Sequence, residues 1–231
     1  MRMKLYCCTF AGGTASFYNE LEKKLAPDIG VKKLEYAGHG ARRKEPFCES
    51  LQKIGIDLYN FIKQEKTEEY ALIGYSMGSI AVIEILRNIL SFNEISYPKY
   101  IFLAAHEPCT KMELPIHNDI ELDDFVKLRT IKFGGVPETL IENQSFWRIY
   151  LPIYRADYLI IEKYKFEELK IRSTIPTVVF YSEEDTPIVE MQKWKNYFVG
   201  ICDFIEYEGG HFFIHKYMEE MAKEIKKRLV M

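Results

Sequence analysis

The pentapeptide from Gly74 to Gly78, Gly-Tyr-Ser-Met-Gly, constrains the fold more than any other stretch of the chain. A short apolar run at 70–73 precedes it, and a run dominated by Ile, Ala, Val and Leu follows at 79–90. Strand, sharp turn and helix form the context of a nucleophile elbow, in which a strained turn exposes the serine hydroxyl. Glycines are needed there because a Cβ would clash where strand and helix approach closely. We therefore predict Ser76 as a nucleophile; the flanks disfavour the alternative, a glycine-rich turn with an incidental serine.

Composition indicates one large domain with a sizeable core, because 48% of the 231 residues are hydrophobic. The net charge of −3 and the lack of long single-sign runs argue against nucleic-acid binding. The five cysteines are scattered and lack metal spacing, so we expect no metal site and reduced thiols in a cytoplasmic protein. Charges interrupt every long apolar run, and the N-terminal apolar stretch is too short for a signal peptide, so no membrane association is expected.

Strand-like and helix-like segments alternate along most of the chain, which predicts an α/β fold with a mostly parallel sheet flanked by helices. The expected strands are 4–9, 31–36, 70–73, 100–105, 177–181 and 202–207. The expected helices are 16–26, 52–66, 79–90, 187–198 and 213–229.

The alternation fails from about 109 to 172, where aromatic-rich helical segments are expected instead. We expect this insertion to leave and re-enter at the sheet edge that holds Ser76, and so to form a helical lid over the nucleophile. Gly134-Gly135 is a natural flexible point. Phe146 and Trp147 are the first candidates for the inner side chains that contact an acyl group. The aromatic residues also fit the insertion's own core.

A carboxylate and a histidine follow Ser76 in the order Ser, acid, His that is typical of the α/β-hydrolase fold. Asp185 lies just after the strand expected at 177–181, and His211 lies on a glycine-rich loop before the last helix. An imidazole accepts the serine proton, and a carboxylate on its other nitrogen holds the tautomer. Glu184 remains an alternative acid. His39 precedes Ser76 in the chain and is interpreted as a turn residue at the rim.

Backbone N–H groups complete such a site by stabilising the oxyanion. In serine hydrolases of this fold, one donor comes from a loop after an early strand and the other from the residue after the nucleophile. These donors correspond to the backbones of Ala11 and Met77, although a glycine-rich turn without a catalytic part would also explain the Ala11 loop. His106 follows an expected strand end and is a possible substrate contact, whereas His215 is interpreted as a packing or surface residue.

Together, five motifs resemble the type II thioesterases of nonribosomal-peptide and polyketide assembly lines. They are Phe10-Ala11-Gly12-Gly13 with Ser16-Phe17-Tyr18, Gly38-His39-Gly40-Ala41-Arg42, Gly74-Tyr75-Ser76-Met77-Gly78, Arg155-Ala156-Asp157-Tyr158 and Gly209-Gly210-His211-Phe212. The resemblance implies hydrolysis of acyl thioesters on the phosphopantetheine arm of an acyl or peptidyl carrier protein. It implies no cofactor beyond that arm, which the substrate carries, and a monomeric enzyme with Ser76, Asp185 and His211 as its triad.

The chain departs from this family at several positions. Tyr75 stands where the family usually has histidine, and Ala37 where it has proline; neither position is expected to touch the mechanism. Thr186 separates Asp185 from Pro187, which leaves the choice between Asp185 and Glu184 open. Other chemistry on the same triad also stays open: a carboxylesterase, an acyltransferase, a medium-chain fatty acyl-carrier thioesterase, or a binding module that has lost catalysis. The basic cluster 42–44 is either a carrier-docking site or a solvated turn.

Overall fold

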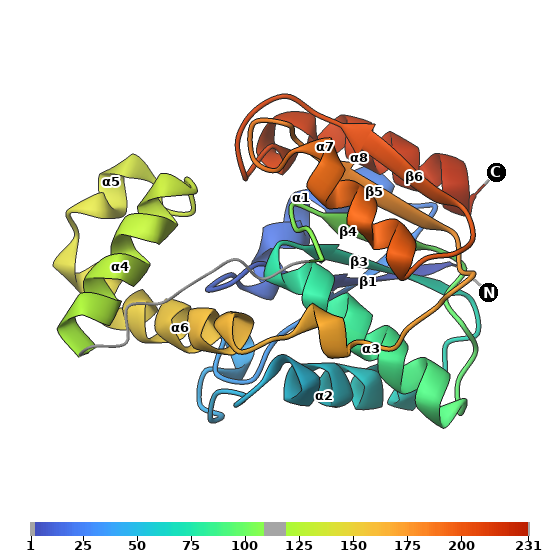
Figure 1. The fold of residues 1–231 in the computed structure, drawn as a ribbon, viewed down its shortest axis with the longest axis horizontal. Helices are drawn as coiled ribbons and strands as arrows, with labels where there is room; N and C mark the ends of the chain where they lie inside the picture. The colour runs from blue at the N-terminus through green and yellow to red at the C-terminus, as the bar shows by residue number, and fades with distance from the viewer. Residues whose placement is uncertain (1–2, 109–118, 231) are drawn as a thin grey trace.

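A computed structural model describes residues 3–108 and 119–230 and contains one six-stranded, fully parallel sheet (Figure 1). Its strands are β1 (Lys4–Cys8), β2 (Gly30–Leu34), β3 (Tyr70–Tyr75), β4 (Ile101–Ala104), β5 (Thr177–Tyr181) and β6 (Cys202–Glu206). They lie in the order β2-β1-β3-β4-β5-β6. The elbow strand β3 is therefore central, and the parallel pairing brings the carboxyl ends of all six strands to one edge.

Helices cover both faces of this sheet. On one face, α2 (Leu51–Gln64) packs on α3 (Met77–Phe92), and on the other α1 (Asn19–Leu25) packs on α8 (Ile214–Leu229). Strand residues alternate between the two layers, so that Tyr6 faces α2 and α3 while Leu5 faces α1 and α8. Outside the segment between β4 and β5, the remaining helices are short: η1 (Ala15–Tyr18), η2 (Gly40–Arg42), α7 (Ile188–Met191) and η4 (Gln192–Asn196).

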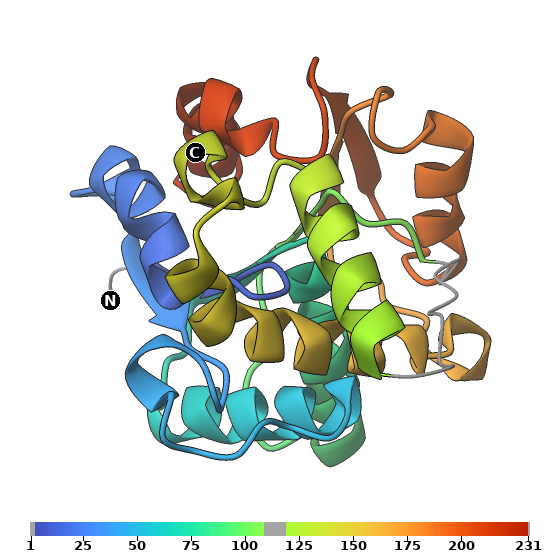
Figure 2. The same ribbon diagram turned by 90° about the vertical axis from the view of Figure 1, so that its left-hand side faces the viewer.

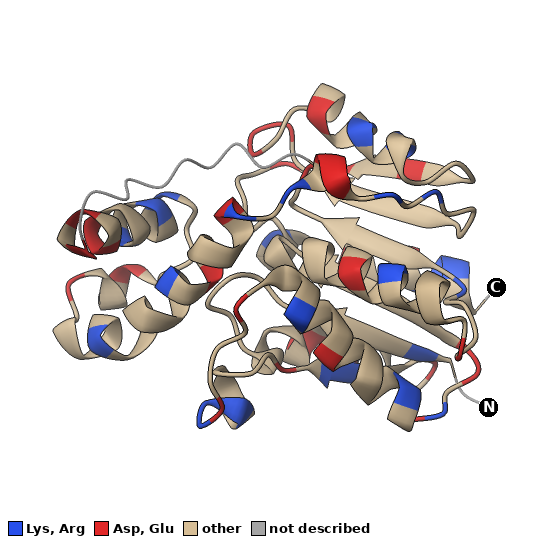
Figure 3. Ribbon diagram, turned by 60° about the horizontal axis from the view of Figure 1, so that its bottom comes forward, with Lys and Arg blue, Asp and Glu red and all other residues tan. Residues whose placement is uncertain are grey.

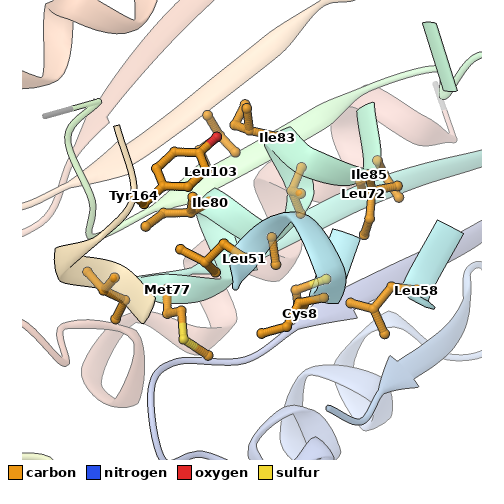
Figure 4. Close-up of a cluster of buried hydrophobic side chains, with 14 of the residues drawn as sticks. Cys8, Leu51, Leu58, Leu72, Met77, Ile80, Ile83, Ile85, Leu103 and Tyr164 are labelled. Atoms are coloured by element: carbon orange, nitrogen blue, oxygen red, sulfur yellow. The ribbon is translucent and has the colours of Figure 1, made fainter. Parts of the chain in front are cut away.

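The core on the α3 side combines branched aliphatic and aromatic side chains. Figure 4 shows Ile80 and Ile83 of α3 beside Leu103 of β4, all fully buried. Tyr164, drawn in the same view, donates a 2.7 Å hydrogen bond to Oε1 of Glu84, a carboxylate that is itself buried within α3. This contact fastens the segment between α6 (Gln144–Glu162) and η3 (Phe166–Glu168) to the core.

The insertion between β4 and β5 contains α4 (Asp119–Lys132), α5 (Glu138–Ile141), α6 (Gln144–Glu162) and η3 (Phe166–Glu168). Helices α4, α5 and α6 lie beyond the sheet edge at which the strands end, and Figure 2 views the molecule from this end. Arg155 of α6 pairs with Asp119 and Asp123 of α4, which ties the two long helices together. The first part of the predicted insertion, 109–118, lies outside the described residues.

The path by which the chain leaves the insertion differs from the expectation. Ile101 pairs with Thr177, so β5 begins at the same edge as β4 begins, opposite the edge that holds Ser76. The chain therefore runs back along the sheet between η3 and β5 rather than re-entering where it left (Figure 1). Parallel strands impose this return, because each must start at the same edge.

The predicted strands and helices agree with the observed elements to within a few residues at each end. Figure 3 shows acidic and basic residues interspersed over the helices in that view. Among the described residues, no helix is long and apolar enough to cross a membrane.

Candidate active site

The turn between β3 and α3 has the strained geometry of a nucleophile elbow. Ser76 adopts φ 53° and ψ −120°, a conformation that a residue with a side chain rarely takes. A Cβ built on Gly74 would overlap the carbonyl of Gly78, and one on Gly78 would overlap the carbonyl of Cys8. Both glycines are thus required sterically, as the sequence predicted, and the turn presents Ser76 at the carboxyl edge of the sheet.

Ser76, His211 and Asp185 lie in one hydrogen-bonded line. The Oγ of Ser76 is 2.9 Å from Nε2 of His211, and Nδ1 of His211 is 2.9 Å and 3.0 Å from the two carboxylate oxygens of Asp185. The carboxylate accepts the Nδ1 proton, which leaves Nε2 free to accept from the serine hydroxyl. The histidine and aspartate side chains are only 11% and 7% exposed, so little water competes for these contacts.

Glu184 has a different partner from Asp185. Its Oε1 accepts a 2.9 Å hydrogen bond from the backbone N–H of Gly209. Ser182 also donates to the carbonyl of Gly209, which has φ 101°. The two contacts fasten the histidine loop to the loop that carries the acid. The geometry therefore places Asp185, and not Glu184, against the imidazole.

Tyr75, at a position not expected to touch the mechanism, contacts the histidine loop. Its hydroxyl donates a 2.6 Å hydrogen bond to the carbonyl of His211. Burial raises the pKa of Tyr75 well above its usual value, so the hydroxyl remains a donor. No local pattern indicated this contact, because the two residues lie 136 positions apart.

The two predicted oxyanion donors flank the nucleophile. Met77 is the first residue of α3, where a backbone N–H has no acceptor within the helix. Ala11 lines the same cavity as Ser76, on the loop that follows β1. The carbonyl of Phe10 accepts a 3.0 Å hydrogen bond from the N–H of Gly13, which closes this loop into a turn.

A cavity of about 240 Å³ opens over Ser76 and is covered by the insertion. The insertion lines it with Arg129, Thr130, Phe133, Tyr154, Tyr158 and Ile161. The Phe133 ring lies 4.6 Å from the His211 ring, centroid to centroid. The insertion thus forms a cap with an aromatic inner surface.

The two aromatic residues first expected to contact the acyl group do not line this cavity. The indole N–H of Trp147 donates to the carbonyl of Ile141, and the Phe146 ring stacks on Tyr150. Both side chains therefore pack within the cap, as in the alternative interpretation of the aromatic residues. The residues of α6 that do line the cavity include Tyr158 and Ile161, about three and four helical turns after Trp147.

The other three histidines among the described residues occupy different environments. His106 lines the cavity, and burial lowers its pKa, so it is neutral near pH 7. His215 is exposed and stacks on Phe212. His39, expected at the rim, is instead 2% exposed and contacts Asp157 of α6, whose side chain is 3% exposed. The motif containing Asp157 had been singled out, but nothing in it indicated the partner.

Asp157 joins the cap to two loops of the sheet. Its Oδ2 accepts a 2.7 Å hydrogen bond from the N–H of Gly12 and lies 2.9 Å from Nε2 of His39. The other ring nitrogen of His39 lies 3.1 Å from the carbonyl of Ala37. Residues 3–108 and 119–230 contain no group of three or more His, Cys, Asp or Glu side chains arranged to hold a metal ion.

A family model for the thioesterase domain matches residues 3–229. The chain belongs to the thioesterase family. This confirms the family and the α/β-hydrolase fold that the motifs indicated, and it identifies the chain as a thioester hydrolase. The match covers the sheet, the cap and all three residues of the Ser-His-Asp line.

Individual relatives agree with this family assignment. The chain is 27% identical to linear gramicidin dehydrogenase LgrE of Brevibacillus parabrevis, covering 97% of this chain and 87% of that protein. It is 28% identical to the medium-chain S-acyl fatty acid synthase thioesterase of Rattus norvegicus, covering 92% and 82%. Among solved structures, ClbQ from the colibactin NRPS/PKS pathway superposes with a TM-score of 0.86 at 25% identity, covering 99% and 97%.

Proposed function

We propose that this thioesterase hydrolyses acyl groups from the phosphopantetheine arm of an acyl or peptidyl carrier protein, as an editing or release enzyme of an assembly line. The observation that carries the proposal is the 2.9 Å contact between Ser76 Oγ and His211 Nε2, backed by Asp185 and set inside a covered cavity. A thioester hydrolase that uses a serine nucleophile needs this arrangement, because a serine hydroxyl is a weak nucleophile until a base accepts its proton.

The chemistry proceeds in two halves. Ser76 attacks the thioester carbonyl while His211 accepts its proton, and the N–H groups of Ala11 and Met77 stabilise the oxyanion. His211 then returns the proton to the departing thiolate sulfur, which leaves an acyl-serine. Water attacks this ester while His211 accepts its proton. His211 then returns the proton to the Oγ of Ser76 as the acyl–oxygen bond breaks, and the free acid departs. Asp185 holds the imidazole and stabilises its charged form throughout.

The names of similar proteins support carrier-bound substrates for this chain. The ClbQ structure is described as belonging to an NRPS/PKS pathway, and Thioesterase PikA5 of Streptomyces venezuelae is 25% identical over 99% of this chain. The Brevibacillus relative carries the name of a dehydrogenase, whereas the family match and the Ser76 geometry favour hydrolysis. We further propose a cytoplasmic monomer that needs no cofactor, since the substrate brings its own phosphopantetheine.

The test compares three substrates that contain the same acyl group: its thioester with a phosphopantetheinylated carrier protein, its thioester with coenzyme A, and a simple ester. We expect the highest kcat/KM on the carrier protein, because contacts far from the thioester contribute to transition-state stabilisation. Ser76→Ala should fold normally and lose activity by roughly a millionfold if the three residues act as a unit. Equal activity on all three substrates would contradict the carrier proposal, and an active Ser76→Ala variant would contradict the mechanism.

Fatty acyl-carrier thioesters are a second candidate substrate class. The 28% identity to the rat medium-chain thioesterase favours it, as does the aromatic and aliphatic lining of the cavity. A series of saturated acyl-carrier thioesters of increasing length, compared with aminoacyl-carrier thioesters, separates the two classes by their kcat/KM.

A further inference from the structure

We propose that His39 and Asp157 form a buried ion pair that holds the oxyanion loop in its catalytic position. Both would be positioning residues for the hydrolysis, acting through Gly12 and not on the substrate. The inference rests on the proposed function, in which the N–H of Ala11 is an oxyanion donor. It makes the cap helix α6 a structural part of the catalytic machinery as well as a cover.

The hydrogen-bond geometry determines the protonation of the pair. Nδ1 of His39 faces the carbonyl of Ala37 at 3.1 Å, and Nε2 faces the carboxylate of Asp157 at 2.9 Å. A carbonyl only accepts, and the carboxylate oxygen already accepts from the N–H of Gly12 at 2.7 Å. Both ring nitrogens therefore carry protons. The result is an imidazolium paired with a carboxylate, at 2% and 3% exposure.

A second carboxylate lies close to this imidazolium. Glu35 accepts hydrogen bonds from the N–H groups of Ala15 and Ala41 at 2.9 Å and 3.2 Å, and its charge also acts on His39. Burial by itself lowers the pKa of His39, but the hydrogen bond and charge of Asp157, with a smaller contribution from Glu35, raise it overall. Folding therefore favours the charged form of His39 more than water does.

The pair acts on the loop through its backbone. Asp157 holds the N–H of Gly12, and the Gly13 N–H to Phe10 carbonyl bond closes the turn, so the Ala11 N–H is fixed from both sides. Gly12 has φ 75°, and a Cβ there would overlap the ring of Tyr154. Tyr154 and Asp157 lie about one turn apart on α6 and hold this loop from the same side. Loss of the carboxylate would free the loop and so misplace an oxyanion donor.

A removed carboxylate at this buried site can also weaken the fold, so the test needs a matched control. Glu84 is that control, because it is another buried carboxylate with a hydrogen bond from Tyr164 but no contact with the oxyanion loop. The variants are Asp157→Asn, Asp157→Ala, His39→Gln and Glu84→Gln. Each is measured for melting temperature, kcat, KM and affinity for a trifluoromethyl ketone analogue of the acyl thioester, which binds serine as an oxyanion adduct.

Asp157→Asn keeps an oxygen that can accept from the Gly12 N–H, but both it and His39→Gln remove the charge pair that holds the loop. Each should therefore lower kcat by about 10- to 100-fold, because a misplaced oxyanion donor costs almost as much as a missing one. The affinity of both variants for the ketone should fall by a similar factor, while KM changes by less than about twofold. Asp157→Ala should lose more kcat and more ketone affinity than Asp157→Asn. Glu84→Gln should lower the melting temperature but leave kcat and ketone affinity nearly unchanged.

A normal kcat in both Asp157→Asn and His39→Gln would overturn the proposal. So would a loss of kcat without weaker ketone binding, since that pattern indicates a purely structural pair. Should one of these variants fail to fold, the other supplies the test from the opposite side of the pair. Failure of the proposed function is separate: it would appear as hydrolysis that survives Ser76→Ala, whatever the Asp157 variants do.

Discussion

The hydroxyl of Tyr75 donates a 2.6 Å hydrogen bond to the backbone carbonyl of His211. Tyr75 directly precedes the nucleophile, and His211 is the base, so one side chain spans the two halves of the reacting pair. The hydroxyl also lies 3.5 Å from the N–H of Ile214, at the start of α8. These hydrogen bonds therefore fix the histidine loop in position relative to the nucleophile elbow.

Tyr75→Phe removes the hydrogen bond to the His211 carbonyl while keeping the aromatic ring. We expect kcat to fall about tenfold with KM unchanged, since the imidazole loses alignment, and unfolding free energy to fall by about 1 kcal/mol. Tyr70→Phe is the matched control, because its hydroxyl donates a 2.6 Å bond to the Ser96 carbonyl at the opposite end of β3. Equal kcat values in the two variants would contradict a role for Tyr75 in catalysis.

Substitutions of the two adjacent acids, Asp185 and Glu184, should differ sharply in their effect on kcat. Asp185→Asn should lower kcat by about 10⁴-fold, because the imidazole loses the carboxylate that holds its tautomer and stabilises its charge. Glu184→Gln should cost less than about tenfold, since an amide oxygen can still accept from the Gly209 N–H. Steady-state kinetics of both variants check the assignment, which a larger effect at Glu184 would reverse.

Acyl-chain preference should depend on Ile161. It lines the cavity over Ser76, whereas the neighbouring Ile160 is similarly buried but does not. Ile161→Ala should shift the preferred acyl group to a longer chain, with each newly buried methylene contributing about 0.8 kcal/mol, or roughly fourfold in kcat/KM. Ile160→Ala should reduce stability by about 2–5 kcal/mol and leave the substrate ranking as in the wild type. A chain-length series on both variants decides this.

Docking of an acidic carrier protein should involve Arg43 and Lys44. The third member of the predicted cluster, Arg42, already pairs with Glu45 and Asp57, so only the other two remain exposed for a partner. Reversing both to Glu should raise KM for an acyl-carrier substrate several-fold and leave the coenzyme A thioester unchanged.

A control for this experiment carries the same change in charge elsewhere. Lys223 and Lys227 on α8 are 71% and 61% exposed, and reversing them should alter neither KM. The docking idea fails if both double variants behave alike, or if the effect on the carrier substrate equals that on coenzyme A.

The His39–Asp157 pair predicts a pH dependence of stability. Because the folded-state pKa of His39 is raised above its usual 6.5, the stabilisation is fully present below about pH 6.5 and is lost as pH rises through the folded pKa. The difference in unfolding free energy between wild type and His39→Gln should therefore shrink on going from about pH 6 to pH 9. Denaturant titrations at several pH values measure it. His106, whose pKa is lowered, is present in both proteins and cancels from the difference.

Local rules were enough to predict much of this protein. The apolar run before Gly74 and the helix after Gly78 identify the elbow, because the steric conflict that requires both glycines lies within a few residues of chain. Strand and helix boundaries likewise follow from periodicity. The meeting of Ser76, Asp185 and His211 follows from topology, since parallel strands deliver their ends to one edge.

Contacts between distant segments were decided only by the tertiary structure. Packing directs Asp185 to the imidazole and Glu184 to a backbone N–H, although both are carboxylates in one turn. The same holds for Asp157, whose partners His39 and Gly12 lie 118 and 145 positions away. The direction in which each aromatic side chain of the cap points also depends on how α4 and α6 pack. Such pairings have no local signature, because the energy that selects them is gained only when the whole chain has folded.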